Sequence, residues 1–133
     1  MATETLVPIT SAEDIVTARQ AGRTLATDLG FESPDVTSIA AAISEVSRNI
    51  LEHAQSGEII LRPENHGSKL GMTVVARDQG PGIADVTQAM QYGYSSRKGL
   101  GVGLPGAKWL MDEFDIESKL GVGTTITMKK WVE

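Results

Sequence analysis

Two short stretches of the sequence carry residue types that could do chemistry. The first, Asp78-Gln79-Gly80-Pro81-Gly82, places a carboxylate where a strand should end, followed by two glycines. A flat heterocycle could approach such a backbone closely while Asp78 accepts a hydrogen bond from its exocyclic amino group. When this stretch is taken alone, a turn with a local aspartate hydrogen bond is the favoured interpretation.

The second stretch, Ser44–Ala54, reads S-E-V-S-R-N-I-L-E-H-A and holds an acid and an amide four residues apart. On a helix this spacing puts Glu45 and Asn49 on one face. They should point well away from a stripe of apolar residues at three- and four-residue steps, formed by Val36, Ile39, Ile43, Val46 and Ile50. A polar face opposite a core face is most often only solvated, so the pair needs support from elsewhere in the chain.

A third pattern, Gly101-x-Gly103-x-x-Gly106, formally matches the glycine loop of dinucleotide-binding proteins or kinases. Its context differs, because it follows a long loop late in the chain and no H-R-D or D-F-G element is present. A P-loop sequence is absent as well. A flexible lead-in to a helix is the alternative interpretation.

Helices and strands follow one another along the chain in an order that predicts the architecture. One helix should begin at Ser11, with Asp14 in its first turn, and end at Gly30. A second should have Ser33 as its cap and Pro34 as its first residue, and run to about His53. Further elements are predicted in chain order as an edge strand at Thr5–Thr10, strands at Glu58–Arg62 and Met72–Arg77 joined by a loose connection at Asn65–Ser68, a short helix at Asp85–Gln91, a mobile loop at Tyr92–Gly103, a helix at Leu104–Glu113 with Trp109 and Leu110 available for packing, and strands at Phe114–Ser118 and Thr124–Trp131.

This order predicts an α+β fold, a two-layer α/β sandwich whose mixed, mostly antiparallel sheet is covered on one face by helices. A length of 133 residues suits one domain, residues 1–133. The formal charge of -5, from 17 acidic and 12 basic residues, argues against a nucleic-acid partner. The absence of cysteine excludes disulfides and thiolate sites and suits the cytoplasm. We also expect no membrane association, because no stretch approaches the ~18 apolar residues of a span.

The order of the motifs carries more information than any one of them. E-x-x-x-N on a helix, D-x-G-x-G, G-L-G-V-G and G-x-G-T-T follow one another along the chain. This series resembles the four nucleotide-binding boxes of the GHKL superfamily (gyrase, Hsp90, histidine kinase, MutL), whose ATP-binding domain has the Bergerat fold. The segments D-I-V-T-A-R-Q-A-G-R, A-I-S-E-V-S-R-N-I and G-L-P-G-A-K-W-L-M-D-E-F are similar to those of RsbT-type serine/threonine switch kinases of the bacterial stressosome.

The resemblance implies ATP and Mg²⁺ as cofactors and gives roles to residues at the phosphate end. Glu45 would be the general base for the attacking hydroxyl, and Asn49 would be the protein ligand of Mg²⁺. Gly99, Gly101 and Gly103 would form a lid whose amides face the phosphates.

At the other end of the nucleotide, the resemblance has Asp78 accept a hydrogen bond from the adenine amino group. Gly80 and Gly82 would make room for the base, and Thr124 would support that end of the pocket. Such a site selects ATP over GTP. Arg97, Lys98 and His53 are left out of the predicted site, because a solvated or carbonyl-capping role is at least as common for such residues.

The resemblance also implies partners. They would be STAS-domain scaffold and antagonist proteins, which the kinase phosphorylates, and a PP2C-type phosphatase, which it activates once released. An anti-sigma factor kinase, which binds a sigma factor and phosphorylates its anti-antagonist, is the alternative. A nucleotide-dependent binding module without phosphotransfer is a third hypothesis, although such a module would not need Glu45.

Overall fold

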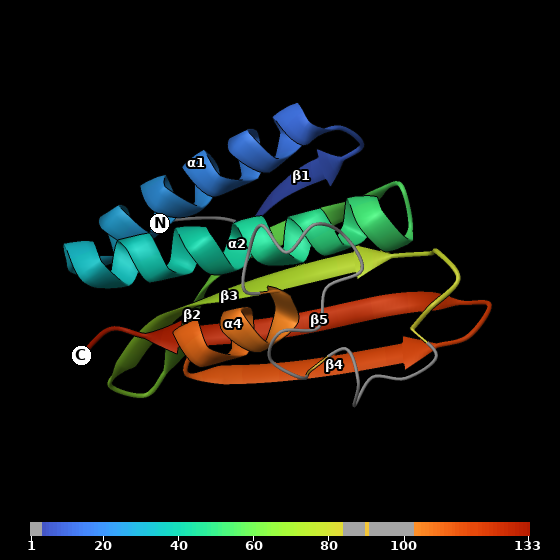
Figure 1. Ribbon diagram of the computed structural model, residues 1–133. Helices are drawn as coiled ribbons and strands as arrows, with labels where there is room; N and C mark the ends of the chain where they lie inside the picture. Colours follow the sequence, from blue (N-terminus) through green and yellow to red (C-terminus); the bar gives the residue numbers. More distant parts are fainter. Residues whose placement is uncertain (1–3, 84–89, 91–102) are drawn as a thin grey trace.

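The computed structural model describes residues 4–83, 90 and 103–133, which form three helices and five strands (Figure 1). The helices are α1 (Ala12–Leu29), α2 (Ser33–His53) and α4 (Gly103–Leu110). The strands are β1 (Thr5–Ile9), β2 (Gly57–His66), β3 (Lys69–Asp78), β4 (Glu113–Lys119) and β5 (Gly123–Trp131). The predicted helix at Asp85–Gln91 and most of the predicted loop at Tyr92–Gly103 lie outside the described residues.

The five strands form one sheet in the order β1-β2-β3-β5-β4, and every neighbouring pair in it is antiparallel. The helices lie on one side of this sheet, with α2 between α1 and α4 (Figure 1). The predicted two-layer α+β sandwich is therefore confirmed. The prediction of a mixed sheet differs from the structure, because all pairs among the described strands are antiparallel.

The core lies between α2 and the sheet. All five residues of the predicted apolar stripe on α2 are at most 8% exposed. Burying each of these side chains contributes roughly 1.5–3 kcal/mol as an upper estimate. They pack with the helix-facing residues of the central strands, which include Ile59, Leu61, Met72, Val74, Ile126 and Met128. This packing fixes the rotation of α2 about its axis, and with it the directions of its polar side chains.

The predicted ends of α1 are confirmed. The Asp14 carboxylate accepts hydrogen bonds from the backbone amides of Thr10, at 2.8 Å, and of the N-cap residue Ser11, at 3.1 Å. These bonds, that from the Thr10 amide first, lower the pKa of Asp14 below its ordinary value. Gly30 ends the helix with a φ of 97°, a left-handed conformation that glycine adopts without steric cost.

The predicted start of α2 is wrong by one residue. Glu32 is the N-cap, Ser33 is the first helical residue and Pro34 is the second. The proline is tolerated there because the amides of the first turn have no partner within the helix. Neither Ser33 nor Glu32 caps the helix with its side chain, and the Glu32 carbonyl accepts the first helical hydrogen bond from Val36.

The loose connection predicted between the second and third strands is also wrong. Asn65 and His66 belong to β2, where they pair with Leu70 and Lys69, so the turn is only the dipeptide Gly67-Ser68. Gly67 has a φ of 63°, which tight hairpin turns require. Both strands are therefore longer than the apolar pattern suggested.

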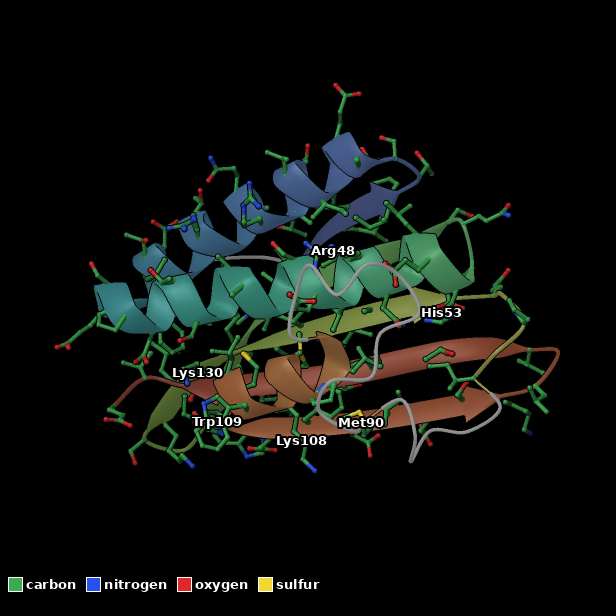
Figure 2. All side chains as sticks on the ribbon, in the orientation of Figure 1. Arg48, His53, Met90, Lys108, Trp109 and Lys130 are labelled. Atoms are coloured by element: carbon green, nitrogen blue, oxygen red, sulfur yellow. The ribbon has the colours of Figure 1, made fainter. Side chains whose placement is uncertain are left out.

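The helix predicted at Leu104–Glu113 ends earlier, at Leu110, and β4 begins at Glu113. The reason is strand pairing, because Glu113 lies opposite Lys129 of β5 and the Asp112 amide donates to the Lys129 carbonyl at 2.9 Å. Leu110 packs against the core as expected. Trp109, labelled in Figure 2, does not, since it is 79% exposed.

Candidate functional site

Asp78 is the last residue of β3 and is buried, with 8% exposure. Its Oδ1 accepts hydrogen bonds from the amide of Gly80, at 2.9 Å, and the amide of Thr124, at 3.3 Å. Within the described residues its second carboxylate oxygen accepts none. A hollow of about 760 Å³ adjoins Asp78 and Thr124. The protein thus fixes one oxygen of this carboxylate and leaves the other available to a ligand.

Thr124 lies directly opposite Asp78 in the pairing of β3 with β5. Its hydroxyl is 2.7 Å from the hydroxyl of Ser118 on β4, and the Ser118 oxygen accepts a hydrogen bond from the amide of Ile83 at 2.6 Å. Sequence reasoning missed Ser118. The signal was available, because the hairpin predicted around Gly121–Gly123 places Ser118 and Thr124 opposite each other.

The two glycines of D-Q-G-P-G are required by the packing of the protein itself. A Cβ at Gly80 would stand 2.5 Å from the Cβ of Ala54, the residue that follows α2. A Cβ at Gly82, where φ is 81°, would stand 2.5 Å from the carbonyl oxygen of Lys119. The loop is therefore held between the end of α2 and the β4–β5 turn, and the space beside these two glycines is filled by protein.

Glu45 lies in the middle of α2 and has 13% of its side chain exposed. Its Oε1 accepts hydrogen bonds from the Arg48 guanidinium, at 2.9 Å, and from the backbone amide of Gly103, at 3.2 Å. Gly103 is the first residue of α4, and a carboxylate is electrostatically favoured at a helix N-terminus. Glu45 therefore ties α2 to the start of the helix that follows the predicted lid.

Asn49 is buried, with 7% exposure, although the sequence predicted a face pointing well away from the core. Besides the sheet, α2 contacts both α1 and α4. No hydrogen bond joins the Asn49 side chain to any other described residue. A side-chain amide oxygen fits the donor set of Mg²⁺, which prefers oxygen ligands. The described residues hold no group of three His, Cys, Asp or Glu side chains that could bind a metal by themselves.

The structure places the predicted residues in two clusters connected by α2. Gly103 lies at Glu45, and Gly80 and Thr124 lie at Asp78. The nine helical steps from Glu45 to Ala54 separate the clusters by roughly 14 Å along the helix. Gly82 packs at the Asp78 end, whereas Gly99 and Gly101, like Arg97 and Lys98, lie outside the described residues. Figure 2 labels Arg48 and His53 on α2; His53 is exposed at the end of the helix.

Comparison with known proteins identifies the family of this chain. A family model described as a histidine kinase-like ATPase domain matches residues 10–130. The chain belongs to this family. It is also 46% identical, over 129 residues that make up 97% of each chain, to the serine/threonine-protein kinase RsbT of Bacillus subtilis. The anti-sigma F factor of Caldanaerobacter subterraneus is 33% identical over 104 residues, 74% of this chain and 71% of that protein.

Solved structures show the same fold. The RsbU and RsbW domains of a Mycobacterium tuberculosis protein superpose with a TM-score of 0.64 and 21% identity, covering 97% of this chain and 32% of that one. The mycobacterial sensor histidine kinase MprB superposes with a TM-score of 0.58 and 20% identity, covering 93% of this chain and 95% of that one. At these identities the likeness supports the histidine kinase-like fold alone.

The relationship to RsbT confirms the predicted enzyme class, a serine/threonine-protein kinase of the RsbT type that acts in partner switching. Membership of the histidine kinase-like ATPase family confirms ATP as its nucleotide. In the part of the chain that the structure describes, no helix is long and apolar enough to cross a membrane. That residues 1–133 form a single domain stays a prediction.

Proposed function

We propose that this kinase phosphorylates serine or threonine residues of STAS-domain scaffold and antagonist proteins in a bacterial stress-signalling pathway. The reaction releases the kinase, which then binds and activates a PP2C-type phosphatase. The identity to RsbT over nearly the whole length of both chains supports this proposal. We propose a cytoplasmic location for the same reason.

One observation carries the catalytic part of the proposal. The Glu45 carboxylate reaches the first amide of α4, which is the place where a helix N-terminus would receive phosphates. A carboxylate there lies next to the transferring group and can take the proton of the acceptor hydroxyl. Gly103 would contribute its amide to the phosphates, together with Gly99 and Gly101.

Asn49 would hold Mg²⁺ through its amide oxygen, one turn beyond Glu45. When bound, the ion would neutralise charge on the phosphates and complete its coordination with phosphate and water oxygens. The buried position of Asn49 and its lack of a partner among the described residues support this role. The protein's own contribution is to keep the amide fixed on a well-packed helix.

At the other end, Asp78 would accept a hydrogen bond from the adenine amino group through the oxygen that Gly80 and Thr124 leave free. The glycines would then act indirectly. Gly80 and Gly82 allow the loop to pack closely, which holds the carboxylate in place. Guanine presents a carbonyl oxygen at the corresponding position, so a carboxylate acceptor selects ATP over GTP.

An anti-sigma factor kinase is the second candidate, because the chain is also 33% identical to an anti-sigma F factor over 74% of its length. That kinase would bind a sigma factor and phosphorylate its anti-antagonist. A pull-down with purified sigma factor separates the two functions. Retention of sigma factor would support the second candidate.

The proposed function is tested by incubating the chain with [γ-³²P]ATP and purified STAS-domain proteins. We expect label on serine or threonine of a STAS-domain protein, and far less of it with Glu45→Ala. When the PP2C-type phosphatase is then added, its activity should rise only in the presence of kinase that the phosphorylation has released. Absence of label on every STAS-domain protein, with ATP binding intact, would contradict the proposal.

A further inference from the structure

A groove of about 700 Å³ lies between α1 and α2 and ends at Glu45. Arg19 and Arg23 of α1 form one wall, and Thr37, Ala41 and Glu45 of α2 line the other. The proposed function above does not use the two arginines or the groove. Two cationic side chains and the carboxylate proposed as the catalytic base therefore line the same groove.

The helix geometry sets the size of this groove. Arg19 and Arg23 are one turn apart on α1, and the α2 residues follow one another at four-residue steps, so each set shares one face. The eight helical steps from Thr37 to Glu45 span roughly 12 Å, which matches three or four residues of extended chain. The helices run in opposite directions (Figure 1), with Gly22 packed on Ile43.

This alignment places Arg19 at the Glu45 end of the groove and Arg23 nearer to Thr37. Arg19 is partly exposed and Arg23 is exposed. Among the residues that the structure describes, neither guanidinium has a carboxylate within ion-pair distance. Within that part of the chain they are two unneutralised cations, and the formal charge of the whole chain is -5. A guanidinium binds carboxylates with two parallel hydrogen bonds, so the pair favours an acidic partner.

We infer that the groove binds an acidic, extended segment of the acceptor protein and delivers its serine or threonine hydroxyl to Glu45. This inference rests on the proposed function. Aspartate or glutamate side chains within about four residues of the acceptor hydroxyl pair with Arg19 and Arg23. The small side chain of Ala41 lets the backbone of that segment lie low in the groove.

The reaction that follows balances. The acceptor oxygen forms a bond to the γ-phosphorus of ATP, the bond from that phosphorus to the β–γ bridging oxygen breaks, and ADP leaves. The hydroxyl proton moves to the carboxylate of Glu45. Arg19 and Arg23 touch the acceptor but not the reacting atoms, so they determine specificity and are not catalytic residues.

The test measures phosphorylation of a STAS-domain protein that the wild-type chain labels, with Arg23→Glu and the double variant Arg19→Glu/Arg23→Glu. We expect the KM for the acceptor to rise about 10-fold and about 100-fold, with kcat at saturation and the Kd for ATP within about twofold. Arg62→Glu is the control for Arg23→Glu, because Arg62 is exposed on β2, where it pairs with Glu4, and the change of charge is the same for these two single variants. It should leave all three constants unchanged.

Charge-reversed acceptors give a readout that a loss of folding would not move. An acceptor protein whose acidic residues near the phosphorylated hydroxyl are replaced by lysine should have a lower KM with the double variant than with the wild type. Unchanged acceptor KM, or an equal rise with Arg62→Glu, would overturn the inference while leaving the proposed function standing. A loss of ATP affinity in Arg23→Glu would mean that the groove binds the nucleotide instead of the acceptor, and it would also overturn the inference. If the wild type binds ATP but labels no STAS-domain protein, the proposed function and this inference both fail.

Discussion

The two ends of the candidate site hold their carboxylates in different ways. At the adenine end, Asp78 is fixed by two backbone amides, those of Gly80 and Thr124, in a buried setting. At the phosphate end, Glu45 is held by the side chain of Arg48, which is 39% exposed, and by one amide at the start of α4. Backbone partners in a strand and in a closely packed loop cannot rotate away, whereas an arginine side chain can.

The difference indicates a division of labour within the site. The proposed adenine end is preorganised, so it would discriminate between bases with little cost of ordering. At the phosphate end, Glu45 accepts a hydrogen bond from the first amide of α4. The same amide could instead donate to a phosphate oxygen. A nucleotide that takes this amide would release the Glu45 carboxylate toward the acceptor hydroxyl. Four substitutions test this comparison, in order of expected effect.

Glu45→Ala should have the largest effect, and only on turnover. Without a base, phosphotransfer should slow by roughly 10²- to 10⁴-fold, while the Kd for ATP changes little because Asn49 and the adenine end are intact. The variant should also stay bound to its acceptor, since release requires phosphorylation. Single-turnover kinetics and calorimetry measure the two quantities. Kinase activity equal to that of the wild type would remove Glu45 as the base.

Asp78→Asn should affect binding rather than turnover. The new amide can still accept the hydrogen bonds of Gly80 and Thr124, but its NH₂ group would face the adenine amino group, donor against donor. An unmade buried hydrogen bond costs about 1–3 kcal/mol, so we expect the Kd for ATP to rise up to roughly 100-fold with the melting temperature nearly unchanged. Normal ATP affinity by calorimetry would refute this assignment of the adenine end.

Gly80→Ala tests whether the adenine end is held by close packing. The added Cβ would lie 2.5 Å from the Cβ and 2.8 Å from the Cα of Ala54. Overpacking of this kind costs about 1–3 kcal/mol, so the free energy of unfolding should fall by that amount. Denaturant titration measures it. In an Ala54→Gly background the loss should shrink, and an equal loss in both backgrounds would mean that the two residues are not in conflict.

Arg48→Ala should have the smallest effect, because it removes a partly exposed ion pair from the adjustable end. Such pairs contribute at most about 1 kcal/mol, so stability and ATP affinity should each change by less than about fivefold in the corresponding constant. Arg48→Lys, which keeps the charge, is the control. A collapse of ATP affinity comparable to that of Asp78→Asn would show that the phosphate end is as rigid as the adenine end.

Much of the fold could be predicted because its signals are local. The apolar stripe of α2 required only helical periodicity, and the ends of α1 required only Ser11, Asp14 and Gly30. The errors lie where tertiary contacts overrule local preference. β5 pairs with residues from Glu113 onward and so shortens α4, and the pairing of β2 with β3 takes up Asn65 and His66.

The candidate site was predictable in its residue types but not in its contacts. The order of the motifs was enough to single out Glu45, Asn49, Asp78 and Thr124. It could not show that Asn49 is buried, because the burial of a helical side chain depends on contacts outside the helix itself. Nor could it show that Gly80 faces Ala54, since the loop after β3 meets the end of α2 only in three dimensions.

The sequence by itself predicted most of the helices and strands, because periodicity and caps act over a few residues, and the order of its motifs singled out the side chains proposed to carry chemistry. Only the tertiary structure decided which polar groups share a site. Glu45 and the amide of Gly103 are 58 residues apart in the chain, and Asp78 and the amide of Thr124 are 46 apart. Such pairs form because burial of the apolar face of α2 fixes that helix on the sheet, and strand register then fixes which residues stand opposite one another.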